Sequence, residues 1–175
     1  MTTTFYPPYH LGGDAMHVYY LSNELAKLGH EVHVIHSIDS YNWQRRGKPV
    51  HKYPNHENVI IHPIKSPIGK ISPLISYIFG FPYPVTKKIR DIISEVKPDV
   101  LHHHNIAGFG PFILGIKAPK VLYTAHDYWL VCPMNGLKKH DGTYCTFKHN
   151  CSICSVFSKR PLQLWRYNIS LYKYI

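Results

Sequence analysis

The chain has 175 residues, of which 45% are hydrophobic and 17% are charged. This composition supplies enough apolar side chains for one core, and it excludes a disordered tail, a coiled coil and a low-complexity linker. Twenty Lys and Arg against ten Asp and Glu give a formal net charge of +10. A charge this basic favours an anionic partner, such as a phosphate-bearing substrate, nucleic acid or an anionic membrane surface.

Helical and strand patterns alternate along the chain. Apolar residues recur every three or four positions over 15–28, on one helical face, and Gly29 follows as a stop signal. A second helix opens at Pro84 and ends before Pro98. The expected strands are residues 31–35, 58–64, 99–102 and 120–124, with a short helix at 112–115 and a loop at 37–58. Because strands alternate with helices, the predicted fold class is α/β, a Rossmann-like doubly wound and mostly parallel sheet.

At both ends of the chain, the sequence predicts shortened secondary-structure elements. Residues 2–5 form a first strand that is short for a parallel sheet, and residues 162–175 have helical character without a cap. We therefore expect a single Rossmann-like domain over residues 1–175 that is one half of a larger protein, with a cysteine-rich loop at 132–154.

Three expected strand ends carry polar residues, and ligands of open α/β sheets bind beyond the carboxyl ends of the strands. The first of these is the paired glycine Gly12-Gly13 before the first helix. Backbone N–H groups at a helix N-terminus attract an anion, and the helix dipole assists. The alternative is a tight turn that needs positive φ. The segment lacks G-x-G-x-x-G and G-x-x-x-x-G-K, which argues against a dinucleotide or P-loop site.

The second strand end is His102-His103-His104-Asn105. Successive strand side chains point to opposite faces, so all three histidines cannot enter one cleft. A metal site is not favoured, because no carboxylate or further histidine stands at useful spacing. We expect His104 or Asn105 to hydrogen-bond a substrate hydroxyl; the alternative is a polar strand end that faces water.

The third strand end delivers His126 and Asp127 side by side. Such a pair can orient a polyhydroxyl substrate and stabilise developing charge. The alternative is structural, with Asp127 capping the segment that follows.

Taken together, these segments resemble the N-terminal domain of a glycosyltransferase family 4 enzyme. The resemblance rests on the Y-P-P loop before Gly12, the helix and strand over 15–35, K-P-D-V-L-H-H-H-N and V-L-Y-T-A-H-D-Y-W-L-V-C-P, and it spans about residues 4–155. It implies one half of a GT-B fold, in which this domain holds the acceptor and a C-terminal domain holds the nucleotide-sugar donor. The family's E-x7-E pair and donor-binding lysine belong to that C-terminal domain, so the isolated chain is expected to be inactive.

The resemblance also implies roles for individual residues. His126 would be catalytic beside the transferred sugar, Gly12 and Gly13 would face the donor diphosphate, and His104, Asn105 and Asp127 would line the acceptor side. It implies transfer of a hexose-type sugar with retention of configuration to a glycan or lipid-linked acceptor, in polysaccharide biosynthesis. No cofactor is expected for catalysis, because helix dipoles and basic side chains offset the diphosphate charge.

Several lysines and arginines suggest that a lipid-linked acceptor is met at a membrane surface. No stretch is apolar for the roughly 20 residues that a spanning helix needs, and no secretory signal opens the chain, so we expect a cytoplasmic protein. Basic residues flank the apolar stretch 71–81, which suits peripheral contact with the inner face of the cell membrane. These are Lys65, Lys70, Lys87, Lys88 and Arg90. The alternative is a buried apolar segment with a solvated basic rim.

Four cysteines are confined to the cysteine-rich loop, with the spacing Cys132-x12-Cys145-x5-Cys151-x2-Cys154. We expect a structural zinc site, because the terminal C-x-x-C has zinc-site spacing and a reducing compartment disfavours disulfides. His140 or His149 could replace one thiolate; disulfides and free thiols remain alternatives. A zinc site in a basic chain also permits a nucleic-acid-binding module. The dispersed Lys and Arg argue against that function, so no nucleic-acid partner is expected.

Overall fold

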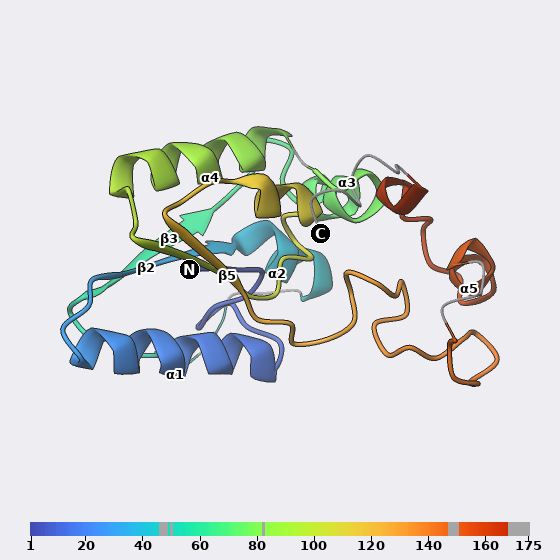
Figure 1. Ribbon diagram of the computed structural model, residues 1–175, viewed down its shortest axis with the longest axis horizontal. Coiled ribbons are helices and arrows are strands. Elements are labelled where there is room, and N and C mark those ends of the chain that lie inside the picture. The colour runs from blue at the N-terminus through green and yellow to red at the C-terminus, as the bar shows by residue number, and fades with distance from the viewer. Residues whose placement is uncertain (46–48, 50, 82, 147–150, 168–175) are drawn as a thin grey trace.

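Five parallel strands form the centre of the computed structural model, in the order β3-β2-β1-β4-β5 (Figure 1). The structure describes residues 1–45, 49, 51–81, 83–146 and 151–167. The strands are β1 (Thr2–Thr3), β2 (Val32–Ser37), β3 (Val59–Ile64), β4 (Val100–His103) and β5 (Lys120–Tyr123). This order and the parallel pairing are those of a Rossmann-like sheet, so the predicted fold class is confirmed.

Helices cover both faces of this sheet (Figure 1). On one face, α1 (Gly13–Lys27) buries Val18 and Ala26 with apolar residues of β2 and β3. On the other, α4 (Tyr83–Val96) buries Ile89 and Ile93 in a second cluster with residues of β2 and β4. Each helix therefore offers one apolar stripe to the sheet, as its sequence period predicts. Leu28 is an exception, because α1 ends before it and 74% of its surface is exposed.

Two helices in the first half of the chain were not predicted. The segment expected as a loop begins with α2 (Ile38–Gln44), and the apolar stretch after Lys70 forms α3 (Ile71–Phe79). Ser37 caps α2, since its hydroxyl accepts a hydrogen bond from the Ser40 N–H at 3.1 Å. The loop prediction was therefore wrong for residues 38–44. The short helix near 112–115 is confirmed as the 3-10 turn η1 (Pro111–Gly115).

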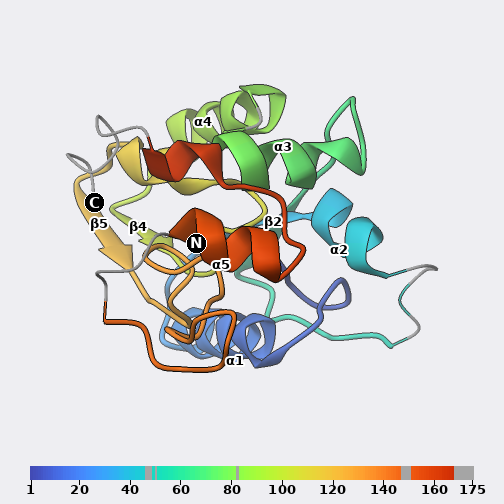
Figure 2. The ribbon, with the colours of Figure 1, turned by 90° about the vertical axis from the view of Figure 1, so that its right-hand side faces the viewer.

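The cysteine-rich loop extends to one side of the sheet, as Figures 1 and 2 show. It contains turns and an isolated bridge between Lys138 and Tyr144, followed by α5 (Cys151–Phe157). A second 3-10 turn, η2 (Leu164–Tyr167), returns to the core, where Trp165 packs on Trp129 at 5.2 Å between ring centroids. The helix expected over 162–175 is limited to η2 where the chain is described, and residues 168–175 lie outside the described residues.

The central position of β1 determines where the chain's polar strand ends meet. β1 pairs with both β2 and β4, and β4 pairs with β5. The segments that leave β1, β4 and β5 therefore emerge at the same edge of the sheet, next to the N-terminus of α1. No helix among the described residues is long and apolar enough to cross a membrane.

Candidate functional site

Asn105 joins the segments that leave β1 and β4 to the first turn of α1. Its Nδ2 donates a hydrogen bond to Asp14 Oδ2 at 2.6 Å, and its Oδ1 accepts one from the Ala107 N–H at 3.1 Å. Thr4 lies on the other side, with its hydroxyl 3.0 Å from Asn105 Oδ1 and accepting from the Gly108 N–H at 2.9 Å. Asn105 is thus held in place by the protein, which contradicts the alternative of a strand end that faces water.

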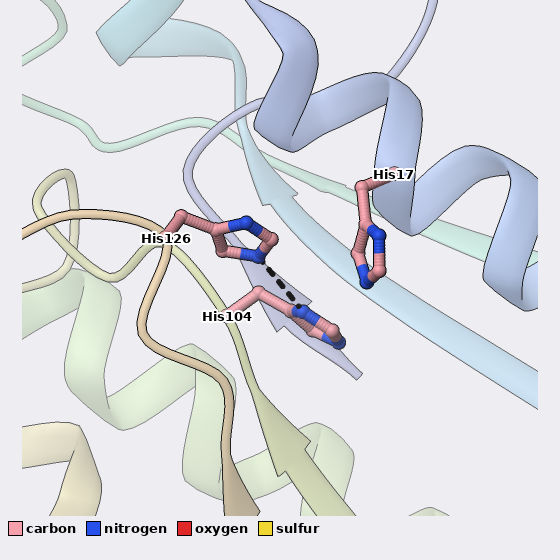
Figure 3. Close-up of side chains that lie close together, drawn as sticks. All are labelled: His17, His104 and His126. Atoms are coloured by element: carbon pink, nitrogen blue, oxygen red, sulfur yellow. Dashed lines mark hydrogen bonds between the residues drawn. The ribbon is translucent and has the colours of Figure 1, made fainter.

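Three histidines from different elements gather beside this network (Figure 3). His104 follows β4, His126 follows β5, and His17 projects from α1. His104 Nδ1 lies 3.2 Å from His126 Nε2, and the His17 ring centroid is 5.7 Å from that of His104 and 5.1 Å from that of His126. His17 was not predicted as a site residue, because it is exposed on a helix whose apolar period describes only the buried face.

Burial keeps the imidazoles of His104 and His126 neutral near pH 7. Burial, reinforced by His102, His126 and His17, lowers the pKa of His104 to about 2. Burial and His17 also lower the pKa of His126, while Asp14 and Asp127 act in the opposite direction. A neutral imidazole can accept a proton at one nitrogen and donate a hydrogen bond at the other, which suits contact with sugar hydroxyls.

The same three histidines have the geometry to hold a metal ion. One nitrogen from each lies within 4.8 Å of the others. Zinc bound to imidazole at its usual distance needs nitrogens about 3.3 Å apart, so modest side-chain movement would bring three ligands together. The expectation that no further histidine stands near His104 is wrong, because the fold brings His17 and His126 to it from distant parts of the sequence.

The other two histidines of the strand confirm the predicted alternation. The His102 ring lies against that of His104, with centroids 4.0 Å apart and the planes tilted by 36°, and its Nε2 contacts the Thr124 hydroxyl at 2.8 Å. His103 points to the opposite face, where its Nδ1 lies 2.7 Å from the Thr2 hydroxyl. Burial lowers the pKa of His103 to about 4. His103 therefore belongs to the interior and not to the cleft.

Gly12 and Gly13 stand at the N-terminus of α1, close to this cluster. Gly12 has extended backbone with φ −170°, and Gly13 begins the helix, so a turn requiring positive φ is excluded. A Cβ at Gly13 would meet no described heavy atom within 4 Å, and one at Gly12 would meet Asp14 Oδ1 at 3.0 Å. The fold itself thus has little need of glycine here, and the missing side chains leave the helix N-terminus open to approach.

A cavity of about 420 Å³ opens beside the cluster. Asn105 and Asp127 line it together with aromatic and basic side chains that sequence analysis did not single out, namely Trp43, Tyr77 and Arg160. Asp127 also caps the next turn, because its Oδ1 accepts a hydrogen bond from the Trp129 N–H at 2.8 Å. The structural role considered for Asp127 is therefore present, and its exposed carboxylate still faces the cavity.

The comparisons with known proteins agree with this architecture. The model of "Glycosyltransferase Family 4" matches residues 11–169, nearly the whole chain. The chain belongs to glycosyltransferase family 4. Among curated proteins, it is 30% identical over 151 residues to an "Uncharacterized 42.6 kDa protein in cps region" of Klebsiella pneumoniae, which covers 80% of this chain and 39% of that protein.

Membership of family 4 gives the site a chemical context. The family implies a nucleotide-sugar donor and a glycan acceptor, and the parallel sheet is consistent with one half of a GT-B fold. This favours a glycosyltransferase domain over the nucleic-acid-binding alternative. The chain spans about two fifths of the relative that it matches.

Proposed function

We propose that this family 4 domain is the acceptor-binding half of a retaining glycosyltransferase. The full-length enzyme would transfer a hexose-type sugar from a nucleotide diphosphate to a glycan or lipid-linked acceptor, in the synthesis of a polysaccharide. The observation that carries the proposal is the cavity beside Asn105 and Asp127, which opens at the sheet edge where His104 and His126 meet. The cps region named for the relative supports a capsule-type polysaccharide.

In this proposal His126 is the catalytic residue. Its neutral imidazole donates a hydrogen bond to the transferred sugar while its other nitrogen contacts His104, which fixes the orientation of the ring. Asp127 and Asn105 border the cavity that takes the acceptor, where a carboxylate can hold a sugar hydroxyl. Asn105 is already hydrogen-bonded to Asp14, and this bond holds the cavity wall in position relative to α1.

The donor diphosphate would approach Gly12 and Gly13. The N–H groups and dipole of a helix N-terminus favour an anion, and neither glycine presents a side chain that obstructs it. Because the dipole and basic side chains supply positive charge, the proposed transfer needs no metal ion or other cofactor. Most donor contacts are assigned to a second domain outside this chain.

Exposed apolar residues support membrane contact for a lipid-linked acceptor. Ile71, Phe79 and Phe81 are each more than two fifths exposed, so the alternative of a buried apolar segment does not hold for them. Lysines lie near them along the chain; Lys87 pairs with Asp91 at 3.0 Å, and Lys88 donates to the Lys65 carbonyl at 2.7 Å. We propose that this surface touches the anionic inner face of the cell membrane.

The test uses the full-length enzyme and a panel of nucleotide sugars with donor hydrolysis as the readout. With the donor identified, His126→Ala should lower turnover about a hundredfold or more while the unfolding temperature stays near that of wild type. His30→Ala, at an exposed histidine between α1 and β2, is the matched control and should change neither quantity. A parallel fall in turnover and unfolding temperature for His126→Ala would show a structural histidine and contradict the assignment.

A further inference from the structure

The histidine cluster is assembled from three parts of the chain that are distant in sequence. His17 projects from α1, His104 follows β4 and His126 follows β5 (Figure 3). One nitrogen from each ring lies within 4.8 Å of the other two, and no other trio of His, Cys, Asp or Glu among the described residues is gathered in this way. The four cysteines are free thiols outside any such group, so the zinc site expected there stays a prediction.

Two of the three rings already have the spacing of metal ligands. His104 Nδ1 and His126 Nε2 are 3.2 Å apart, close to the separation of about 3.3 Å between two imidazole nitrogens on one tetrahedral zinc ion. His17 is exposed on α1, so its side chain has room to turn and supply the third nitrogen while the buried His104 stays in place. An ion can therefore replace the hydrogen bond between His104 and His126 with a small movement at His17.

The surroundings of His104 suit reversible binding of an ion. Its Nδ1 faces His126, and its buried Nε2 has no hydrogen-bond partner among the described residues. A histidine that holds a resident metal usually donates its second N–H to a carboxylate or a carbonyl, and loss of that partner weakens metal binding by about 10- to 100-fold. His104 lacks this support. The ion has a path from solvent, because His17 is exposed and His126 is half-buried.

Two carboxylates beside the cluster offset the charge of a cation. Asp14 precedes His17 by three residues on α1, so the two share one face of the helix. Its carboxylate is held by the Asn105 Nδ2 at 2.6 Å, and it lies in the first turn, where it counters the positive end of the helix dipole. Asp127 directly follows His126. A divalent ion at the three rings therefore has negative charge on two sides.

We infer that His17, His104 and His126 form a reversible zinc site that inhibits the enzyme. Imidazole nitrogens suit zinc and its neighbours among the transition metals, whereas magnesium and calcium prefer oxygen ligands. Three imidazoles leave the fourth tetrahedral position to water or to a sugar hydroxyl. The ion is not part of the proposed transfer, which needs none.

The inhibitory effect rests on the proposed function, whereas metal binding itself does not. In the proposed mechanism the contact with His104 fixes the His126 ring so that its other nitrogen meets the transferred sugar. An ion bound to His126 Nε2 breaks that contact and draws the ring towards His17. It also places a cation and its water at the sheet edge where the cavity opens. Zinc and productive sugar binding therefore exclude each other.

The first test measures metal binding in the full-length protein, purified without a histidine tag and titrated with cobalt as a spectroscopic substitute for zinc. We expect the visible bands of a four-coordinate cobalt ion with nitrogen ligands, displaced by zinc and not by excess magnesium. His17→Gln, which keeps a polar side chain without an imidazole, should weaken binding at least about tenfold. His17→Glu supplies a carboxylate ligand and should retain binding, and His30→Ala, at an exposed histidine, should not change it.

Two results would overturn the site. One is equal cobalt affinity in wild type and His17→Gln. The other is a spectrum dominated by sulfur-to-metal charge transfer that is unchanged in His17→Gln, which would place the ion at the cysteines. Every variant keeps all four cysteines, so the comparison isolates the histidine ligand.

The second test measures zinc inhibition, with each variant compared with its own turnover in the absence of zinc. His17→Gln should require at least about tenfold more zinc than wild type for half inhibition, and His17→Glu should remain sensitive. Zinc that binds at the cluster and leaves turnover unchanged would overturn the inhibitory role. Cobalt binding that depends on His17 in a full-length protein without transferase activity would support the ion site and contradict the proposed function alone.

Discussion

His36 makes the stability of this domain sensitive to mild acid. The residue lies next to the end of β2, is 2% exposed, and stacks on Tyr9 with ring centroids 5.9 Å apart. Its Nδ1 is buried and finds no hydrogen-bond partner among the described residues. Burial lowers the pKa of His36 to about 4 from an ordinary value of 6.5. The folded state therefore keeps this ring neutral in a pH range where the unfolded chain takes up a proton.

The sign and size of the effect follow from that difference. Between pH 6.5 and pH 4 the unfolded state binds more protons than the folded state, so the free energy of unfolding falls as the pH falls through this window. A pKa lowered from 6.5 to about 4 corresponds to a loss in the free energy of unfolding of about 2 kcal/mol at pH 5. The loss reaches about 3 kcal/mol once the pH is below both pKa values. His103, with its pKa lowered to about 4, adds a loss in the same direction.

Urea unfolding at pH 7.5 and pH 5.0 measures this loss. His36→Phe keeps a flat ring against Tyr9 and removes the titrating group, so the loss between the two pH values should shrink by about 2 kcal/mol. His30→Phe, at an exposed position, should leave the loss unchanged. If His36→Phe lost as much stability as wild type on acidification, the folded protein would accept the proton at His36 and the reasoning would be refuted.

Three further results are expected. Gly110→Ala should lower the free energy of unfolding by about 3 kcal/mol or more, or prevent folding, because φ is +82° and a Cβ would lie 1.7 Å from the Gly80 carbonyl oxygen. Gly115→Ala, where a Cβ would meet nothing within 4 Å, should lower the free energy of unfolding by under about 1 kcal/mol in the same urea titration. Added zinc should inhibit the full-length enzyme through the histidine cluster, and His17→Ala should relieve it; unchanged inhibition in that variant would place the inhibitory ion elsewhere. Calorimetry of this chain alone should detect no UDP- or GDP-sugar binding at micromolar concentrations, and a strong signal would contradict the assignment of the donor to another domain.

The sheet was predictable because its strands are local patterns. β-branched runs such as the one in β2 need no knowledge of their neighbours, and the proline and glycine signals around α4 are equally local. The signal for the missed helix α2 is one hydroxyl, since Ser37 supplies the N-cap of a segment in which every residue except Ile38 is polar or aromatic. Such a cap stabilises a short helix that has no helical period of apolar residues in its sequence.

The candidate site was predictable only in part. His104, Asn105 and His126 could be placed at strand ends, because parallel strands deliver their following residues to one edge. His17 could not be assigned to the cluster from the sequence, since its place there depends on how α1 packs against β2 and β3. Prediction of the cavity also requires knowledge of how the elements pack, because Trp43, Tyr77 and Arg160 reach it from three separate segments.

The two-residue strand β1 bears on the order in which this domain can fold. Its Thr2 pairs with Ile35 on one side and with His103 on the other, and the Thr2 hydroxyl contacts a partner 101 positions away. During synthesis, β2, β3 and α1 can associate early, but the far edge of β1 stays unpaired until β4 has emerged. At ordinary rates of translation that interval is roughly 5 to 20 s. Pairings this distant in sequence close slowly, so the centre of the sheet is completed late and the nascent chain carries an open strand edge at β1 until β4 pairs with it.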